Sequence, residues 1–272
     1  MVEEQKYKIA LITAYVGTGE DAELSFAHDA KAELAAYGVD IYMFNNESVD
    51  VLKSYIEPTL SKNDIIHETK FEKSIFRWYL RFKYKQNLKP KEQDNYTRLI
   101  AKIPKILFYN LIPNDYDYYI WLDSKFTIHK HWLDYVLWLI RKYPAVDIIT
   151  SKHSERNSIA IELDLMNEQM KKFKTKSFLS KYNLLEINNQ VKRYLKSPKF
   201  VDDKLYELGM IIYSSKMLGK TDFLEEWYAH NYYLSIQDQL SFPYLCKKYI
   251  IAVQGVKQDI INMPFARHEY GL

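Results

Sequence analysis

Residues 115–125 read Asp-Tyr-Asp-Tyr-Tyr-Ile-Trp-Leu-Asp-Ser-Lys, and this stretch decides the fold. The run from Tyr118 to Leu122 is aromatic and aliphatic without alternation, which is typical of a strand covered on both faces. Asp123 follows this strand directly, at the position where open α/β sheets bind ligands. A carboxylate there can hold a metal, a ribose or a sugar hydroxyl, or it can simply cap the next turn.

The preceding sequence predicts two neighbouring strands, over Tyr7 to Tyr15 and Val39 to Phe44. A helical pattern over Asp21 to Tyr37 separates them and ends at a glycine. Such a β-loop-α-β opening begins a parallel sheet. The loop after the first strand carries Gly-x-Gly without a third glycine, so it matches a dinucleotide fingerprint only weakly.

The second half continues the alternation of strands and helices. Strands are predicted over Val146 to Thr150 and Leu205 to Tyr213, and helices over His131 to Tyr143, Asn157 to Tyr194, Thr221 to Tyr233 and from Ser235 onward. The stretch Ser151 to Arg156 and the tail after residue 261 are predicted as loops. No repeat or Gly/Ser linker divides the chain. The sequence therefore predicts one α/β domain over residues 1–272, with a central, mostly parallel sheet flanked by helices.

Composition narrows the function classes. Hydrophobic residues make up 47% and charged residues 27%, which predicts a folded, soluble chain, and a net charge of +3 is too small to argue for nucleic acid. The single cysteine, Cys246, excludes an intramolecular disulfide and a zinc cluster. The polar start and the lack of an 18-residue apolar run predict a cytoplasmic protein without a transmembrane segment, with peripheral membrane contact left open.

Aromatic and basic side chains suggest a ligand. The 24 tyrosines suit sugar rings and bases, or reflect an AT-rich genome. A predicted helix over Phe71 to Tyr84 carries a basic stripe at four-residue spacing, made of Lys73, Arg77, Arg81 and Lys85. Arg98 and Lys102 repeat that spacing in the next helix, which Pro104 ends or bends. The stripe is either a solvated face or a site for an anion such as a diphosphate.

Acids lie at the ends of predicted elements: Asp123 after a strand, Glu207 before one, and Asp238 at a helix start. A nucleotide-sugar transferase needs these residue types. Its diphosphate leaving group requires a metal or cations, and its acceptor hydroxyl requires a carboxylate base.

The ordered series of motifs resembles a family. The motifs of this series are Arg98 to Pro104, Tyr116 to Lys125, His153 with Arg156, Glu207-Leu208-Gly209, Trp227, and Gln237 to Phe242. The series, from about Tyr7 to Phe265, is similar to the small glycosyltransferases with a GT-A fold found in plants, bacteria and large viruses. They include the plant mucilage-related group once known only as a domain of unknown function.

This resemblance implies a nucleotide-sugar donor, with UDP favoured, in a nucleotide-binding half of about residues 1–125. Donor-binding residues would be Thr13, Ala14, Tyr15, Arg77, Arg81, Arg98, Lys102, Asp123, Ser124 and Lys125. Asp123 would stand in the aspartate-x-aspartate position and His268 would match a C-terminal histidine, and together they would hold a divalent Mn or Mg ion.

The resemblance also implies a glycan acceptor in the half from about residue 126 to 272. Asp238 would be the base of an inverting displacement and Glu207 would position the sugar or acceptor. Substrate contacts would come from His153, Arg156, Gly209, Trp227 and Gln239.

The chain departs from the motif at Lys125, where the second acid is expected. A protonated lysine cannot ligate a divalent cation. The favoured interpretation is that Asp123 and His268 hold the metal with few protein ligands; the alternative is that cations such as Lys125, Arg77 and Arg81 replace it.

Each assignment has a structural alternative. Asp238 can be a helix-start acid, Glu207 a partner of a nearby lysine, and His268 a surface histidine. His153 and Arg156 can form a simple polar loop, and Trp227 can be a core residue. The rival functions are a non-catalytic carbohydrate-binding protein, a glycoside hydrolase, which needs two carboxylates across the bond, and a nucleic-acid-binding module.

Overall fold

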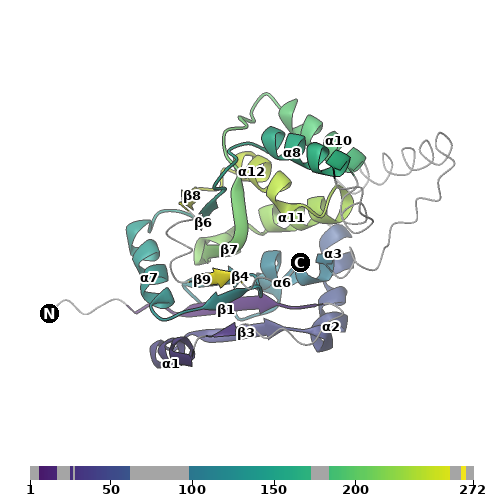
Figure 1. Ribbon diagram of the computed structural model, residues 1–272. Coiled ribbons are helices and arrows are strands. Elements are labelled where there is room, and N and C mark those ends of the chain that lie inside the picture. Colours follow the sequence, from purple (N-terminus) through teal and green to yellow (C-terminus); the bar gives the residue numbers. More distant parts are fainter. Residues whose placement is uncertain are drawn as a thin grey trace.

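The centre of the protein is a six-stranded sheet with the order β3-β1-β4-β7-β6-β8 (Figure 1). The computed structural model describes residues 6–16, 25–26, 28–61, 98–172, 184–257 and 265–267. The strands of this sheet are β1 (Ile9–Ala14), β3 (Asp40–Phe44), β4 (Tyr118–Leu122), β6 (Ile148–Lys152), β7 (Tyr206–Ser214) and β8 (Val253–Val256). β7 runs antiparallel to both neighbours, whereas the other pairings are parallel. The predicted α/β class with a mostly parallel sheet is confirmed.

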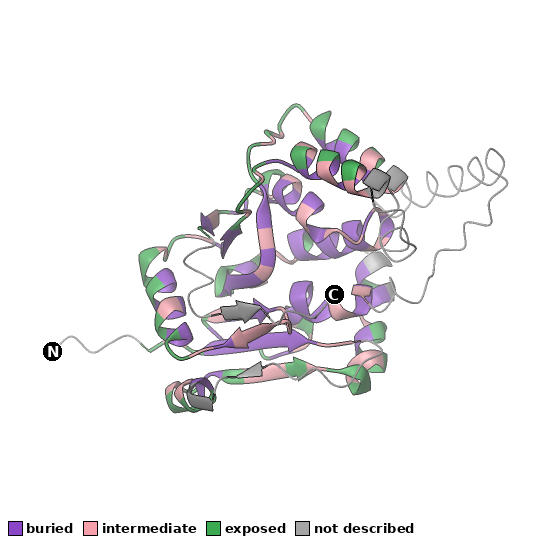
Figure 2. Ribbon diagram, viewed as in Figure 1, coloured by how far each residue is buried: buried purple, intermediate pink, exposed green. Residues whose placement is uncertain are grey.

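Alternate residues of the central strands pack into two hydrophobic cores, one on each face of the sheet. Ile9 and Leu11 of β1 pack with α1 (His28–Tyr37) and α7 (Trp132–Lys142). Ala10 and Ile12 pack on the opposite face, whose core is completed by α6 (Ile103–Ile106), α11 (Thr221–Tyr233) and α12 (Asp238–Lys248). Figure 2 shows these central strands as buried. Because both faces are covered, the strands need no polar alternation, which explains the unbroken apolar runs of the sequence.

A third core lies at the far side of α12. It joins α8 (Ile159–Lys172) and α10 (Leu184–Leu195), which Figure 1 shows side by side beyond α11 and α12, to Leu205 and Leu240. The remaining described elements are η1 (Asn46–Ser48), α2 (Val49–Ser54), α3 (Ile56–Ser61), η2 (Phe108–Asn110), η3 (Ser215–Gly219) and a small sheet of β2 (Ser25–Phe26), β5 (Phe126–Ile128) and β9 (Phe265–Arg267). Within the described ranges, no helix has the length and apolar character needed to cross a membrane.

Several predicted boundaries were wrong. β2 occupies part of the helix predicted from Asp21, Ser151 and Lys152 extend β6 instead of starting a loop, and β9 interrupts the predicted tail loop. β5 and β8 were not predicted. These strands have two to five residues, too few for a recognisable hydrophobic period, so pairing with distant strands defines them. The helix predicted over residues 71–84 lies outside the described residues.

A buried carboxylate, Glu226, ties α11 to the end of α12. Lys248 Nζ lies 2.8 Å from its Oε1 and 2.6 Å from its Oε2, the Tyr249 hydroxyl donates to Oε2, and His230 Nε2 lies 3.3 Å from Oε1. Burial alone would raise the pKa of Glu226, but the hydrogen bonds from His230, Lys248 and Tyr249 outweigh it and lower the pKa to about 2.

We therefore expect acid to unfold the protein partly through Glu226. A depressed carboxyl pKa contributes stability that is present above the unfolded value of 4.5 and is lost as the pH falls towards about 2. Glu226→Gln should lower the free energy of unfolding at pH 7 by about 3 kcal/mol, because it breaks a buried ion pair. It should also flatten the loss of stability below pH 4.5. Urea unfolding at several pH values measures both effects, with Glu168→Gln on the exposed face of α8 as control. Equal acid sensitivity of the Glu226 variant and the wild type would contradict this role.

Candidate active site

Two hollows meet at the carboxyl ends of β1, β4 and β6. One, about 330 Å³, is bordered by Ala14, Arg98 and Lys102 and is called the cationic lobe. The other, about 520 Å³, is bordered by His153, Glu155, Arg156, Glu162 and Glu207 and is called the acidic lobe. Both are lined by Lys105, Asp123, Lys125, Gln237 and Asp238. The shared residues make the two lobes one cleft, at the edge of the sheet where α/β folds bind ligands.

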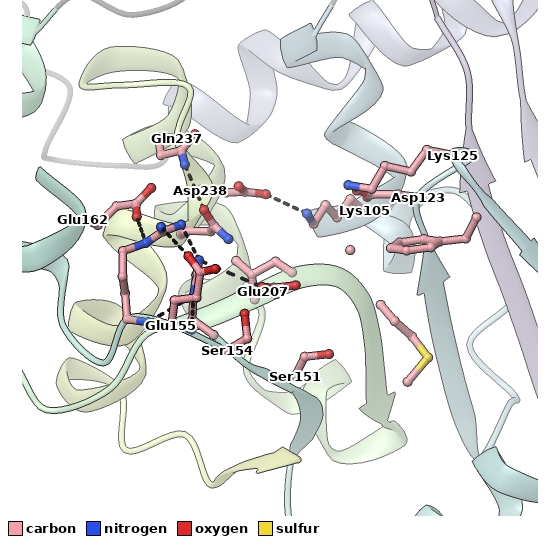
Figure 3. A pocket seen from close by; sticks show the side chains of 17 residues that line it. Lys105, Asp123, Lys125, Ser151, Ser154, Glu155, Glu162, Glu207, Gln237 and Asp238 are labelled. Atoms are coloured by element: carbon pink, nitrogen blue, oxygen red, sulfur yellow. Dashed lines mark hydrogen bonds and ion pairs between the residues drawn. The ribbon is translucent and has the colours of Figure 1, made fainter. Parts of the chain in front are cut away.

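The two lobes differ in charge. The cationic lobe has four basic side chains, Arg98, Lys102, Lys105 and Lys125, against the carboxylates of Asp123 and Asp238. The acidic lobe has five carboxylates, against Lys105, Lys125 and Arg156. Figure 3 shows the same division, with Lys105, Lys125 and Asp123 on one side, Glu155, Glu162 and Glu207 on the other, and Asp238 between them. The cleft therefore has one end with an excess of basic side chains and one end with an excess of carboxylates.

Asp238 holds two lysines at the junction of the lobes. Lys102 Nζ lies 2.8 Å and Lys105 Nζ 2.6 Å from the same carboxylate oxygen, Oδ2. Burial alone would raise the pKa of Asp238, but the two ammonium groups outweigh it and hold this pKa well below its usual range. Burial also lowers the pKa of Lys102, although Asp238 partly opposes this shift. At neutral pH Asp238 is thus ionised and serves as counter-ion to the lysine pair.

Local backbone structure brings these three side chains together. The helix over residues 98–101 breaks at Lys102, and α6 begins with Pro104 in its first turn, where the missing N–H costs nothing. The Tyr213 hydroxyl donates to the Lys105 carbonyl oxygen at 2.8 Å and so fixes α6 on β7. Asp238 occupies the first turn of α12. Each lysine is therefore presented by a short helical segment packed on the sheet.

Asp123 lies at the end of β4, as the sequence predicts, and both of its carboxylate oxygens accept hydrogen bonds. Trp121 Nε1 donates to Oδ1 at 2.8 Å, and Lys125 Nζ donates to Oδ2 at 2.7 Å. Burial would raise the pKa of Asp123, but Lys105 and Lys125 outweigh it, so the pKa is lowered. This position therefore carries an ionised aspartate that is already engaged by an indole and an ammonium group.

A bulge in β7 shapes the wall between the lobes. Thr150 of β6 pairs with Ile211, but the next residue, Ser151, pairs with Glu207, so residues 208–210 have no partner in β6. The Thr150 hydroxyl donates towards the carbonyl oxygens of Glu207, at 3.0 Å, and Met210, at 2.7 Å, and satisfies part of the interrupted ladder. All three bulge residues and Glu207 line the acidic lobe. Bulges commonly turn side chains towards sites in this way.

The acidic lobe is organised around Arg156. Its Nη2 lies 2.5 Å from His153 Nε2. Its Nε lies 2.5 Å from Glu162 Oε2, and this contact is an ion pair whose N–H does not point at the carboxylate oxygen as a hydrogen bond requires. Burial and the neighbouring Arg156 lower the pKa of His153, so the imidazole is neutral at pH 7. His153 Nε2 is also 3.9 Å from Glu207 Oε1. This arrangement offers carboxylate acceptors and one fixed guanidinium to polar groups of a ligand.

Most residues predicted for the site meet in the cleft. They are Ala14, Arg98, Lys102, Asp123, Ser124, Lys125, His153, Arg156, Glu207, Gly209, Asp238 and Gln239. Thr13 and Tyr15 flank Ala14 without lining either lobe. Trp227 is fully buried behind the cleft, and its indole N–H donates to the Asp238 carbonyl oxygen at 3.3 Å. Arg77, Arg81 and His268 lie outside the described residues, so their assignments stay predictions.

Sequence reasoning missed several cleft residues, above all Lys105. The sequence did contain a signal for Lys105, because Lys102 and Lys105 are three residues apart, on either side of a proline. A single lysine in a short apolar helix, however, resembles an ordinary surface residue. Phe126, Ser151 and Glu162 were also missed. No local pattern marks these three: the pairing of β6 with β7 brings Ser151 to the cleft, α8 brings Glu162, and Phe126 begins the short strand β5.

The described residues contain one group of three metal-ligand side chains that are close to one another, made of Glu33, His131 and Asp134. None of them lines either lobe of the cleft. This group therefore does not correspond to the metal site predicted at Asp123 and His268.

Gly209 is the place where a small change should disturb this geometry. An added Cβ would lie 2.7 Å from Phe126 Cε2 and 3.5 Å from Asp123 Oδ2, whereas at Gly219 nothing lies within 4 Å. We expect Gly209→Ala to destabilise the protein by about 1–3 kcal/mol through overpacking. Gly219→Ala should change stability by no more than about 0.5 kcal/mol. Urea unfolding measures both variants, and equal stability of the two would contradict the close packing at the bulge.

Comparison with known proteins identifies the family. The family model described as "TOD1/MUCI70, glycosyltransferase-like domain" matches residues 86–266, which is well over half of the chain and includes every residue that lines the cleft except Ala14. No curated protein matches the sequence.

Solved structures show a distant likeness. Mouse xyloside xylosyltransferase 1, in its apo form, is 8% identical, with 92% of this chain and 84% of that chain covered and a TM-score of 0.41. The WbbM bifunctional glycosyltransferase, also apo, is 11% identical, with 94% of this chain and 40% of that chain covered and a TM-score of 0.36. These scores carry no argument about substrates. The extent of the family match, by contrast, is decisive: this chain belongs to the TOD1/MUCI70 family of glycosyltransferase-like domains.

Proposed function

We propose that this protein transfers a sugar from a nucleotide-sugar donor, with UDP as the nucleotide, to a hydroxyl group of a glycan acceptor, with inversion at the transferred carbon. The observation that carries the proposal is the position of Asp238, which lies at the junction of a cationic lobe and an acidic lobe. A transferase requires this order of parts: an anion site for the leaving group, a base, and a site for a hydroxyl-rich acceptor.

The cationic lobe suits the donor. Its four basic side chains exceed its two carboxylates, so it favours the negative charge of a diphosphate. We assign the nucleotide to the end of β1, where Ala14 lines this lobe, because the family resemblance implies a nucleotide at Thr13, Ala14 and Tyr15. Asp123 and Ser124, at the end of β4, would lie beside the diphosphate and ribose.

The acidic lobe suits the acceptor and the transferred sugar. Carboxylates accept hydrogen bonds from sugar hydroxyls, and Glu207 projects into this lobe from the bulged part of β7. Arg156 and Gln239 offer donors to ring and hydroxyl oxygens. We assign Glu207 to positioning of the sugar or acceptor, with His153, Arg156 and Gly209 forming the surrounding wall.

The proposed step is a single displacement. The acceptor oxygen attacks the anomeric carbon while the bond from this carbon to the phosphate oxygen breaks, and the electron pair leaves with the nucleoside diphosphate. The acceptor proton passes to the Asp238 carboxylate. In the ligand-free protein two lysines weaken this carboxylate as a base, and a diphosphate that attracts the lysines would restore its basicity.

Calorimetric titration of a panel of nucleotide sugars and free nucleotides tests the donor assignment. We expect one UDP-sugar to bind more tightly than the other members of the panel. Absence of binding by every nucleotide would refute the transferase and favour a non-catalytic carbohydrate-binding protein, which the aromatic composition would also fit. Release of free sugar without transfer to any acceptor would instead favour a hydrolase.

Asp238→Asn tests the base. We expect it to reduce transfer by about 10²–10⁴-fold, the usual contribution of a general base, while UDP binding survives. Turnover with a matched donor and acceptor measures the effect, and thermal melting of the variant checks that it folds. Asp164→Asn, at an exposed position of α8, is the control. Unchanged turnover of the Asp238 variant would remove this residue from the mechanism.

A further inference from the structure

Three lysine ammonium groups converge where the proposed donor diphosphate would lie. Lys102 and Lys105 share Asp238 Oδ2, at 2.8 Å and 2.6 Å, and Lys125 lies 2.7 Å from Asp123 Oδ2. All three border the cationic lobe. Lys102 and Lys105 are largely shielded from solvent, with side chains 16% and 7% exposed. Because they are shielded, their attraction to an anion is stronger than that of surface lysines.

The described residues at this place do not fit a resident Mn or Mg ion. These ions are bound through oxygen ligands, chiefly carboxylates. Both oxygens of Asp123 are engaged, by Trp121 Nε1 and Lys125 Nζ, and the residue two positions further on is a lysine. The other carboxylate among the residues that line both lobes, Asp238, is held by two ammonium groups. A divalent cation would therefore enter a region where basic side chains already outnumber the acids.

We propose that Lys102, Lys105 and Lys125 neutralise the donor diphosphate in place of a divalent metal ion. The inference rests on the proposed transferase function and specifies how its donor site works. In the ligand-free protein, Asp238 and Asp123 act as counter-ions to the lysines. When a diphosphate binds, its oxygens replace Asp238 at Lys102 and Lys105, and Asp238 turns to the acceptor.

The same lysines would serve the chemical step. Negative charge grows on the leaving diphosphate as its bond to the sugar breaks, and ammonium groups already positioned in a shielded cleft stabilise that charge. Lys105 is the central member, because it borders both lobes and its backbone is fixed to β7 through Tyr213. Lys125 borders both lobes as well, and its place beside Asp123 gives it access to the second phosphate.

Binding of UDP and of inorganic pyrophosphate, measured by calorimetry in EDTA, in Mn and in Mg, tests the inference without an activity assay. We expect the UDP affinity of the wild type in EDTA to stay within about threefold of that in Mn. A metal ion that held the diphosphate would change the affinity by more than this, since one charge-assisted hydrogen bond alone is worth about tenfold or more. Lys102→Met and Lys105→Met should each weaken binding in EDTA by about tenfold or more. Lys192→Met, on an exposed face of α10, should leave it unchanged.

Lys125→Asp is the sharpest variant, because it restores an acid two residues after Asp123. We expect it to weaken UDP binding in EDTA by about tenfold or more, for the same reason, and to regain affinity when Mn is added. Wild-type binding that is lost in EDTA and restored by Mn would overturn the lysine assignment and leave the transferase standing. Absence of UDP binding under every condition would overturn the transferase itself, and this inference with it. The wild-type measurements decide the question even if a variant fails to fold.

Discussion

The ion pairs between Asp238 and the two lysines are the constraint on which the cleft depends. Lys105 and Asp238 are 133 residues apart in sequence, and their side chains meet in a largely buried position. A buried ammonium group without a partner would be strongly unfavourable, and so would a buried carboxylate. α6 and the first turn of α12 must therefore be positioned so that these charges meet, and the charges meet where the two lobes join.

The charges also explain why the cleft can have two unlike ends. Asp238 compensates the lysines from one side, while Asp123 and Lys125 compensate each other beside them. The acids beyond Asp238 are gathered around Arg156 and the bulge of β7. A ligand with a negative diphosphate at one end and a hydroxyl-rich sugar at the other complements this gradient.

The sequence predicted the main strands well, because strands buried on both faces appear as unbroken apolar runs. Tyr118–Leu122 was placed without error, and Asp123 was placed at its end. The antiparallel direction of β7 and the short strands β5, β8 and β9 depend on pairing between distant segments, which leaves no local pattern. Among the candidate site residues, Asp123, Glu207 and Asp238 were found as acids at element ends and most others through the family resemblance, while Glu162 and Phe126 were missed. Lys105 was missed because its spacing from Lys102 alone does not separate it from a surface lysine, whereas its ion pair with Asp238 does.

The crystal structure of the protein with UDP is the most direct test of this account. We predict that the diphosphate lies in the cationic lobe with its oxygens within hydrogen-bonding distance, about 2.7–3.2 Å, of Lys102 Nζ and Lys105 Nζ. The Asp238 carboxylate should then have turned away from both lysines towards the acidic lobe. A diphosphate bound outside this lobe, or one held through a metal ion at Asp123 while Asp238 keeps both lysines, would contradict the account.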